Sequence, residues 1–243
     1  MKIIKLDAID STNDFLKGLS NEISTQNFTV VTAETQTNGK GQMGSKWSSE
    51  SGKNLIVSVL LKNILLDINA IFNLNVVIAF SIFEALKSFK IFELSIKWPN
   101  DIMSGNKKIA GILIENIIKS DNSINSIIGF GLNVNQVNFD YLPNASSLKK
   151  IMNQEFDKEI ILNKILESIQ KNISELEQSN INLIWTLYNE NLFKKGKIML
   201  FENNIRDKFM GIIQNVSRDG KLQLLVENDI ILEFDKKEIS MIY

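Results

Sequence analysis

The sequence predicts an α+β protein, with a central mixed or antiparallel sheet covered by helices and a small β-rich domain after it. Two patterns support this fold class. Short β-rich runs separated by turns recur through the first half of the chain, and apolar residues repeat at helical spacing in two further regions. From Lys194 onward the pattern contains only short strands and turns. We therefore predict two domains, residues 1–193 and 194–243.

Composition narrows the chemistry that this chain can perform. With 243 residues, of which 44% are hydrophobic, the chain can bury a substantial core without covalent cross-links. Its net charge of −1 provides no broad basic surface, so DNA is not an expected partner. The absence of Cys and His excludes disulfides, Cys or His metal sites and imidazole bases. Any chemistry must use lysines, carboxylates, hydroxyls, backbone dipoles or Mg²⁺.

No targeting or membrane-spanning segment is predicted. The chain opens directly on the β-rich run Lys2 to Leu6, without the pattern of a signal peptide. The longest apolar run, Val76 to Phe83, is interrupted by Glu84 and is too short to cross a bilayer. We expect a soluble, cytoplasmic protein with no membrane partner.

The first helix start carries hydroxyl groups. Ile3 to Leu6 is a predicted strand, and Ser11 then stands at the N-cap of a helix with Asp14 at the capping-box position. Capping alone explains these residues. The hydroxyls and free N–H groups at a helix start can also bind a neutral polar ligand, so both interpretations stay open.

A polar loop, Glu34 to Asn54, lies between two predicted strands, Phe28 to Ala33 and Leu55 to Leu61. Residues 39–44 spell G-x-G-x-x-G, but no helix begins there, so the dinucleotide fingerprint is rejected. Flexible backbone N–H groups and lysines instead favour a nest for an anionic ligand. A mobile hairpin loop is the alternative, and Trp47 argues against it because a large aromatic side chain favours burial.

The middle of the chain predicts a helix, three strands and a pocket. The elements are a helix at Ile71 to Phe89, a strand at Leu94 to Trp98 ended by a turn at Pro99 to Asp101, a hairpin turn at Ser104 to Lys108, and strands at Ile109 to Glu115 and Ile127 to Asn135. Glycines inside strands mark close approaches of backbone or ligand. Gly111, Gly129 and Gly131 on adjacent strands therefore indicate one shared pocket.

The last part predicts helices and then a barrel. Helices are expected at Ile161 to Leu176 and Leu183 to Leu192, and strands at Lys197 to Phe201, Phe209 to Val216, Leu222 to Val226 and Ile230 to Phe234. The two helices should cover the sheet. The four closely spaced strands favour a small barrel-like domain.

Five short motifs in this order resemble those of biotin protein ligases. They are Asp10-Ser-Thr-Asn13, Gln36 followed by Gly39-Lys-Gly-Gln-Met-Gly-Ser-Lys-Trp47, Lys97-Trp-Pro-Asn-Asp101, Lys108-Ile-Ala-Gly111 and Gly129-Phe-Gly-Leu-Asn133. The resemblance covers nearly the whole chain. It implies the catalytic fold shared by biotin and lipoate ligases, similar to class II aminoacyl-tRNA synthetases, followed by a C-terminal SH3-like barrel that starts near Lys195.

The resemblance also implies a reaction. Biotin and MgATP would give biotinyl-5′-AMP and pyrophosphate, and a lysine of a biotin carboxyl carrier protein would then attack the mixed anhydride. By the same resemblance, biotin would be bound by Ser11, Thr12, Asn13, Gln36, Gly39, Lys40 and Gly111. ATP and the adenylate would be bound by Lys40, Gln42, Met43, Lys46, Trp47, Asn100, Lys108 and Asn133.

Two residues are the expected catalytic groups. Lys108 would lie beside the reacting carboxylate and the α-phosphate, and Asp101 would orient the incoming lysine. A lysine supplies positive charge without a proton acceptor, which suits a chain that lacks histidine. No metal ligand is expected from Cys or His, and Mg²⁺ would arrive with ATP.

The polar loop Glu34 to Asn54, called the glycine loop from here on, departs from the better-known family pattern. Lys40 and Gln42 stand where arginine is common, so a bidentate guanidinium grip on phosphate is lost and the intermediate is expected to be retained less tightly. We also expect residues 38–52 to be mobile without ligand and to close over biotin or the adenylate. No helix-turn-helix segment precedes the ligase motifs, so a repressor role is not expected.

Two other functions stay open. A lipoate or octanoate protein ligase shares the catalytic fold, but such relatives usually carry a nearby His, and the motif Lys97 to Asp101 favours biotin. A non-catalytic module that binds biotinyl-AMP is the third possibility, and the intact Lys108 argues against it. The sequence does not determine the carrier protein, or whether the chain is a monomer or a homodimer.

Overall fold

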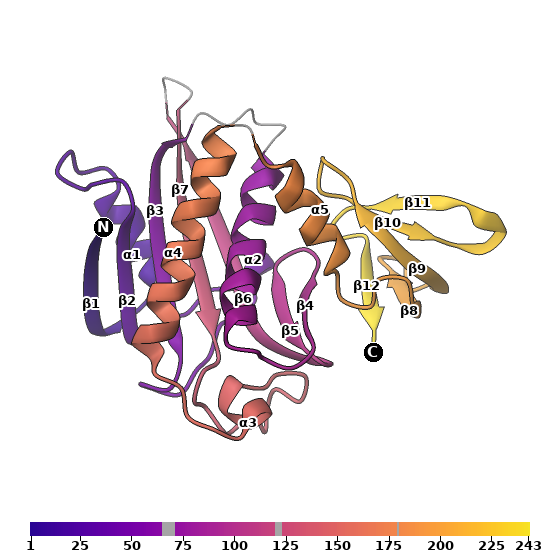
Figure 1. Cartoon of the computed structure of the whole chain (residues 1–243), viewed down its shortest axis with the longest axis horizontal. Coiled ribbons are helices and arrows are strands. Elements are labelled where there is room, and N and C mark those ends of the chain that lie inside the picture. Colours follow the sequence, from indigo (N-terminus) through magenta and orange to yellow (C-terminus); the bar gives the residue numbers. More distant parts are fainter. Residues whose placement is uncertain (65–70, 120–122, 179) are drawn as a thin grey trace.

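The computed structural model describes residues 1–64, 71–119, 123–178 and 180–243 and has the predicted α+β fold (Figure 1). Its larger sheet has the strand order β1-β2-β3-β7-β6-β5-β4. The strands are β1 (Lys2–Ile9), β2 (Thr29–Gln36), β3 (Leu55–Ile64), β4 (Leu94–Lys97), β5 (Asp101–Ser104), β6 (Lys107–Ile118) and β7 (Ile124–Leu132). Only the pair of β1 and β2 is parallel, so this sheet is mixed, as predicted.

Helices cover both faces of the larger sheet. They are α1 (Thr12–Leu19), α2 (Ile71–Ser88), α3 (Leu148–Met152), α4 (Lys158–Glu177) and α5 (Asn182–Glu190). Side chains alternate between the two faces of a strand. Val30 accordingly joins the core under α2 and α4, whereas its neighbour Val31 packs with Leu16 of α1 on the opposite face. The strand pattern therefore places α1 alone on one side, and Figure 1 shows α2 and α4 together on the other.

Helix α2 is apolar around most of its circumference because it lies between the sheet and two other helices. Its length and its mean hydropathy of 1.4 would suit a membrane span, but 72% of it is buried inside the protein. Among the described residues it is the one helix with these properties. Burial in the core accounts for them.

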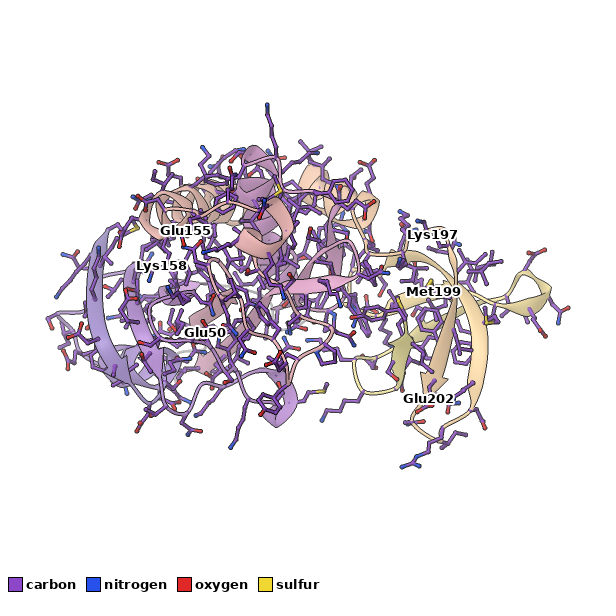
Figure 2. All side chains as sticks on the ribbon, turned by 90° about the horizontal axis from the view of Figure 1, so that it is seen from below. Glu50, Glu155, Lys158, Lys197, Met199 and Glu202 are labelled. Atoms are coloured by element: carbon purple, nitrogen blue, oxygen red, sulfur yellow. The ribbon has the colours of Figure 1, made fainter. Side chains whose placement is uncertain are left out.

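The C-terminal region forms a second, antiparallel sheet with the strand order β11-β10-β9-β8-β12, consistent with the predicted SH3-like barrel. Its strands are β8 (Ile198–Asn203), β9 (Lys208–Val216), β10 (Leu222–Leu225), β11 (Ile231–Phe234) and β12 (Ile239–Ile242). Figure 2 shows Met199 and Glu202 on β8, to one side of the helices. The sheet starts shortly after the predicted domain boundary, which stays a prediction.

Several short elements differ from the sequence-based expectation. The predicted turn at Pro99 to Asp101 was too long, because Asp101 already begins β5 and pairs with Lys97. Helix α3 and strand β12 were missed. Each has only four or five residues, too few to show a period, and α3 is marked only by Ser147, which caps it by accepting from the Lys150 N–H.

Glu84 of α2 accepts hydrogen bonds from three side chains of α4, and this contact should make stability depend on pH. The partners are Ser168 at 2.7 Å, Asn172 at 3.2 Å and Lys171 at 3.3 Å. Burial alone would raise the pKa of the Glu84 carboxyl, but these hydrogen bonds and the Lys171 charge lower it below 4.5.

We expect Glu84→Gln to reduce the free energy of unfolding near pH 7 and to lose this effect in acid. A lowered pKa in the folded state stabilises the protein above the ordinary value of 4.5, and the stabilisation is lost as the pH falls through the lower, folded-state pKa. Urea unfolding of both proteins across this range measures the difference. Glu167→Gln on the exposed side of α4 is the control. A difference between Glu84→Gln and wild type that does not change with pH would contradict this account.

Candidate active site

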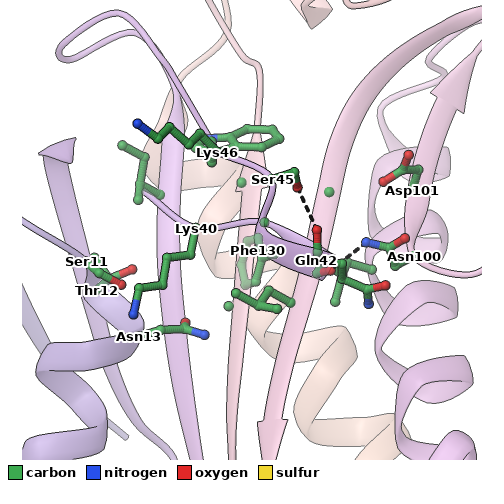
Figure 3. Close-up of a pocket in the computed structure, with 18 of the residues that line it drawn as sticks. Ser11, Thr12, Asn13, Lys40, Gln42, Ser45, Lys46, Asn100, Asp101 and Phe130 are labelled. Carbon is green, nitrogen blue, oxygen red and sulfur yellow. Dashed lines mark hydrogen bonds between the residues drawn. The ribbon is translucent and has the colours of Figure 1, made fainter. Parts of the chain in front are cut away.

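A cavity of about 290 Å³ opens on the same side of the sheet as α1 (Figure 3). Leu60 and Ile127 pack on α1, and residues two positions further along β3 and β7 face the same way. Most of the predicted site residues line it: Ser11, Thr12, Asn13, Gln36, Lys40, Gln42, Met43, Lys46, Trp47, Asn100, Asp101, Lys108 and Gly111. Five separate motifs therefore meet at one cavity, while the ligand assigned to each residue stays a prediction.

The start of α1 forms a neutral polar end of the cavity. Ser11, Thr12 and Asn13 are 2–4% exposed. Ser11 caps the helix by accepting from the Asp14 N–H, so the capping interpretation is confirmed. Both the backbone N–H and the hydroxyl of Thr12 donate to Oε1 of Gln36, at 2.8 and 3.0 Å. These bonds fix the Gln36 carboxamide, because its oxygen is held by Thr12 and its nitrogen must face elsewhere.

The bare backbone of three glycines forms the floor of the cavity. Gly111 on β6 pairs with Gly131 on β7, and Gly129 lies two residues along the same strand. A Cβ atom at Gly131 would overlap the indole of Trp47, and one at Gly111 would come within 3.3 Å of it. The predicted shared pocket is therefore confirmed. Among the described residues, the buried indole N–H of Trp47 has no hydrogen-bond partner.

Lys108 and Asp101 form an ion pair at the rim of the cavity, with Nζ 2.7 Å from Oδ1. Their side chains are 35% and 18% exposed, so the pair is only partly screened by water. The backbone of Lys108 is held on its outer side by the loop before α3. Its N–H donates to the Asn144 carbonyl at 2.8 Å, and its carbonyl accepts from the Ser146 N–H at 3.0 Å. These contacts fix the backbone of Lys108, and the ion pair with Asp101 holds its ammonium group.

The glycine loop folds into a tight hairpin over this rim. Lys40 and Lys46 face each other in an isolated antiparallel bridge, and residues 42–44 make a short 3₁₀ turn that carries Gln42 and Met43. The ammonium of Lys40 lies 2.7 Å from the carboxylate of Asp14. The hydrogen bond to Asp14 raises the pKa of Lys40, so this lysine is charged at neutral pH.

Two predicted site residues do not line the cavity. Gly39 is buried, and a Cβ atom there would overlap the carbonyl oxygen of Trp47 and meet Nε2 of Gln36 at 2.7 Å, so this glycine lets the loop close. Asn133 is 5% exposed, and its carboxamide donates to the carbonyl of Ser146 at 3.0 Å. It thereby supports the loop that holds Lys108. Ligand contacts by these two residues stay predictions.

Sequence reasoning missed two residues that surround Asn13. Ser58 of β3 is fully buried and contacts Asn13, and Glu115 of β6 accepts a hydrogen bond from it. A serine inside the apolar run Leu55 to Leu61 was a signal for the first. No local pattern marked the second. In the described part of the chain no three Asp or Glu side chains gather into a metal site, and the expected magnesium ion stays a prediction.

Comparison with known proteins identifies the family. The model described as the biotin/lipoate A/B protein ligase family matches residues 6–133. The bifunctional ligase/repressor BirA of Bacillus spizizenii is 29% identical over 76% of this chain, which spans only 59% of that protein. The biotin–[acetyl-CoA-carboxylase] ligase of Mycobacterium tuberculosis is 26% identical over 80% of this chain and 72% of its own length.

A solved structure agrees over the full length. The biotin protein ligase from Aquifex aeolicus in complex with biotin and ATP has a TM-score of 0.82 at 28% identity, covering 99% of this chain and 98% of that one. The predicted resemblance to biotin protein ligases is confirmed by these matches. The chain belongs to the biotin/lipoate A/B protein ligase family.

Proposed function

We propose that this protein is an ATP-dependent biotin ligase, which activates biotin as biotinyl-5′-AMP and transfers it to a lysine of a biotin carboxyl carrier protein. One observation carries the proposal: the ion pair of Lys108 and Asp101 faces the same cavity as the neutral polar groups at the start of α1. The cavity thus combines a site for an uncharged head group with a cation at its rim. The Aquifex relative, solved with biotin and ATP, supports the choice of substrates.

The polar end of the cavity suits a cyclic urea. Such a group has one carbonyl acceptor and two N–H donors, and it carries no charge. Ser11 and Thr12 supply hydroxyls, and Gln36 supplies the free nitrogen of its carboxamide. Buried neutral partners bind a neutral ligand without the desolvation cost of an ion. This set favours biotin over lipoate, whose dithiolane ring has no comparable donors or acceptors.

The two reaction steps use the rim of the cavity. A carboxylate oxygen of biotin attacks the α-phosphorus of ATP, forming the acyl phosphate bond as the bond to pyrophosphate breaks. The amine of the carrier lysine then attacks the acyl carbon, an amide forms, and AMP leaves. Lys108 would offset the negative charge that grows on the phosphate oxygens in the first step. Asp101 would orient the amine in the second and accept its proton.

Magnesium is expected to accompany ATP and to screen the triphosphate charge. Because the described residues form no carboxylate cluster, the nucleotide itself would supply most of its ligands. From composition alone we also propose a cytoplasmic location and no DNA partner. The oligomeric state, monomer or homodimer, and the particular carrier protein are left to experiment.

Incubation with labelled biotin, ATP and a carrier domain tests the function. We expect label on a carrier lysine that survives denaturation, because the product is an amide. A non-catalytic adenylate-binding module would release its label on denaturation. A lipoate ligase would transfer lipoate in preference to biotin. Either of these two results would refute the proposal.

Removal of Lys108 should affect the first step most. We expect Lys108→Ala to slow adenylate formation, measured as pyrophosphate release, by about 10²–10³-fold, the usual effect of losing one preorganised donor. Transfer from added biotinyl-5′-AMP should fall less, because that step forms no bond to phosphorus. Lys107→Ala is the matched control, since Lys107 donates to the Pro143 carbonyl and does not line the cavity. Equal losses in both variants would contradict the assignment.

The glycine loop should become protected from protease when the ligand binds. Lys40, Lys46 and Lys53 are exposed, and trypsin is expected to cut after them in the ligand-free protein. Ordering about ten loop residues costs on the order of 10–20 kcal/mol, so a closed loop needs ligand contacts to persist. Bound adenylate should slow cutting in the loop and leave cutting at the distant, exposed Lys90 unchanged. Equal loop cutting with and without adenylate would rule out closure.

A further inference from the structure

The side chain of Asn13, at the polar end of the cavity, contacts three neighbouring strands. Its Oδ1 atom is 2.6 Å from the hydroxyl of Ser58 on β3. Its Nδ2 atom donates to Oε2 of Glu115 on β6 at 2.8 Å. Between these strands runs β7, where Gly129 has no side chain, and a Cβ atom there would come within 2.9 Å of Asn13 Cγ. The carboxamide therefore fills a slot that has one polar partner at each end.

The Glu115 carboxylate fixes which end of this carboxamide is which. An ionised carboxylate only accepts hydrogen bonds, so the NH₂ group of Asn13 must point to β6 and its oxygen to β3. That oxygen in turn can only accept, and it therefore takes the single proton of the Ser58 hydroxyl. Glu115 thus determines the direction of two successive hydrogen bonds without help from a ligand.

The direction of these hydrogen bonds also affects the hydroxyl group of Thr12. The Ser58 hydroxyl also lies 2.8 Å from Oγ1 of Thr12, but its proton is committed to Asn13. Thr12 consequently receives no proton from Ser58, and it donates its own proton to Oε1 of Gln36. A lone pair of the Thr12 hydroxyl is then left to accept an N–H group of a ligand in the cavity. The hydroxyl is prepared as an acceptor before the ligand binds.

We propose that Glu115 is a positioning residue for biotin, acting through Asn13 and Ser58 to hold the start of α1 and to keep Thr12 an acceptor for a ureido N–H. The inference rests on the proposed function. Neither Glu115 nor Ser58 lines the cavity, so their effect on the ligand is indirect. The nearby cation Lys40 is hydrogen-bonded to Asp14 and interacts with Glu115 only through its charge, so the described hydrogen bond of the Glu115 carboxylate is the one to Asn13.

Steady-state kinetics with biotin and ATP test the role. We expect Glu115→Ala to raise KM for biotin by about tenfold, with KM for ATP and kcat changed less than about twofold, as expected for the loss of about one buried hydrogen bond. Glu115→Gln should restore part of the loss, because its carboxamide oxygen still accepts from Asn13 although its NH₂ group also permits the reversed arrangement. Equal changes in KM for biotin and for ATP, or no rescue by glutamine, would overturn the proposal.

A double-mutant cycle separates the indirect role from direct contact. If Glu115 acts through Asn13, the variant Glu115→Ala/Asn13→Ala should bind biotin no more weakly than Asn13→Ala alone. Additive losses would overturn the proposal. If Glu115→Ala does not fold, Ser58→Ala tests the same chain of hydrogen bonds, and it should also raise KM for biotin more than KM for ATP. Glu159→Ala removes an exposed carboxylate that is paired with Lys5 and is the control.

The same assays distinguish this inference from the proposed function. Wild-type protein that transfers no label to a carrier lysine would refute the function itself. Active wild-type protein with an additive cycle would refute only the role of Glu115.

Discussion

The site depends on a sheet surface that has no side chains at three adjacent points. Gly111, Gly129 and Gly131 leave the backbone of β6 and β7 bare on the α1 side. Two segments distant in sequence use this bare surface, because Asn13 lies against Gly129 and Trp47 lies against Gly131. A methyl group at either position would push its neighbour away from the sheet. The cavity exists because the helix start and the glycine loop can both approach the sheet closely while leaving space between them.

Two of the three lysines that line the cavity are paired with carboxylates before any substrate arrives. Lys108 is paired with Asp101, and Lys40 with Asp14, both at 2.7 Å. These two partners lower the cost of keeping the ammonium groups partly buried. In the proposed reaction the two arriving anions would compete with Asp101 for the Lys108 ammonium. That competition would free the Asp101 carboxylate at the moment when an amine must be oriented.

Local patterns predicted the fold class and the motifs but not the contacts between strands. Helix α2 was predicted from its helical period and strand β3 from its β-rich apolar run, and the cluster of motifs was found because each contains an unusual glycine or charged residue. Glu115 was missed because its partner is Asn13, 102 positions earlier, and only the pairing of the strands brings them together. The nucleotide contact expected of Asn133 stays a prediction, and no local pattern marked the hydrogen bond that its carboxamide donates to the Ser146 carbonyl.

The segment from Lys97 to Asp101 connects the second sheet to the chemistry. At one end the Lys97 ammonium donates to the hydroxyl of Tyr243 at 3.0 Å, and the indole of Trp98 donates to the carbonyl of Gly220 at 2.9 Å. At the other end Asp101 pairs with Lys108. Lys97 and Trp98 therefore contact the C-terminal region, and Asp101, in the same short segment, lines the cavity. A displacement of that sheet would change the backbone that carries Asp101, so the geometry of the ion pair depends on both sheets.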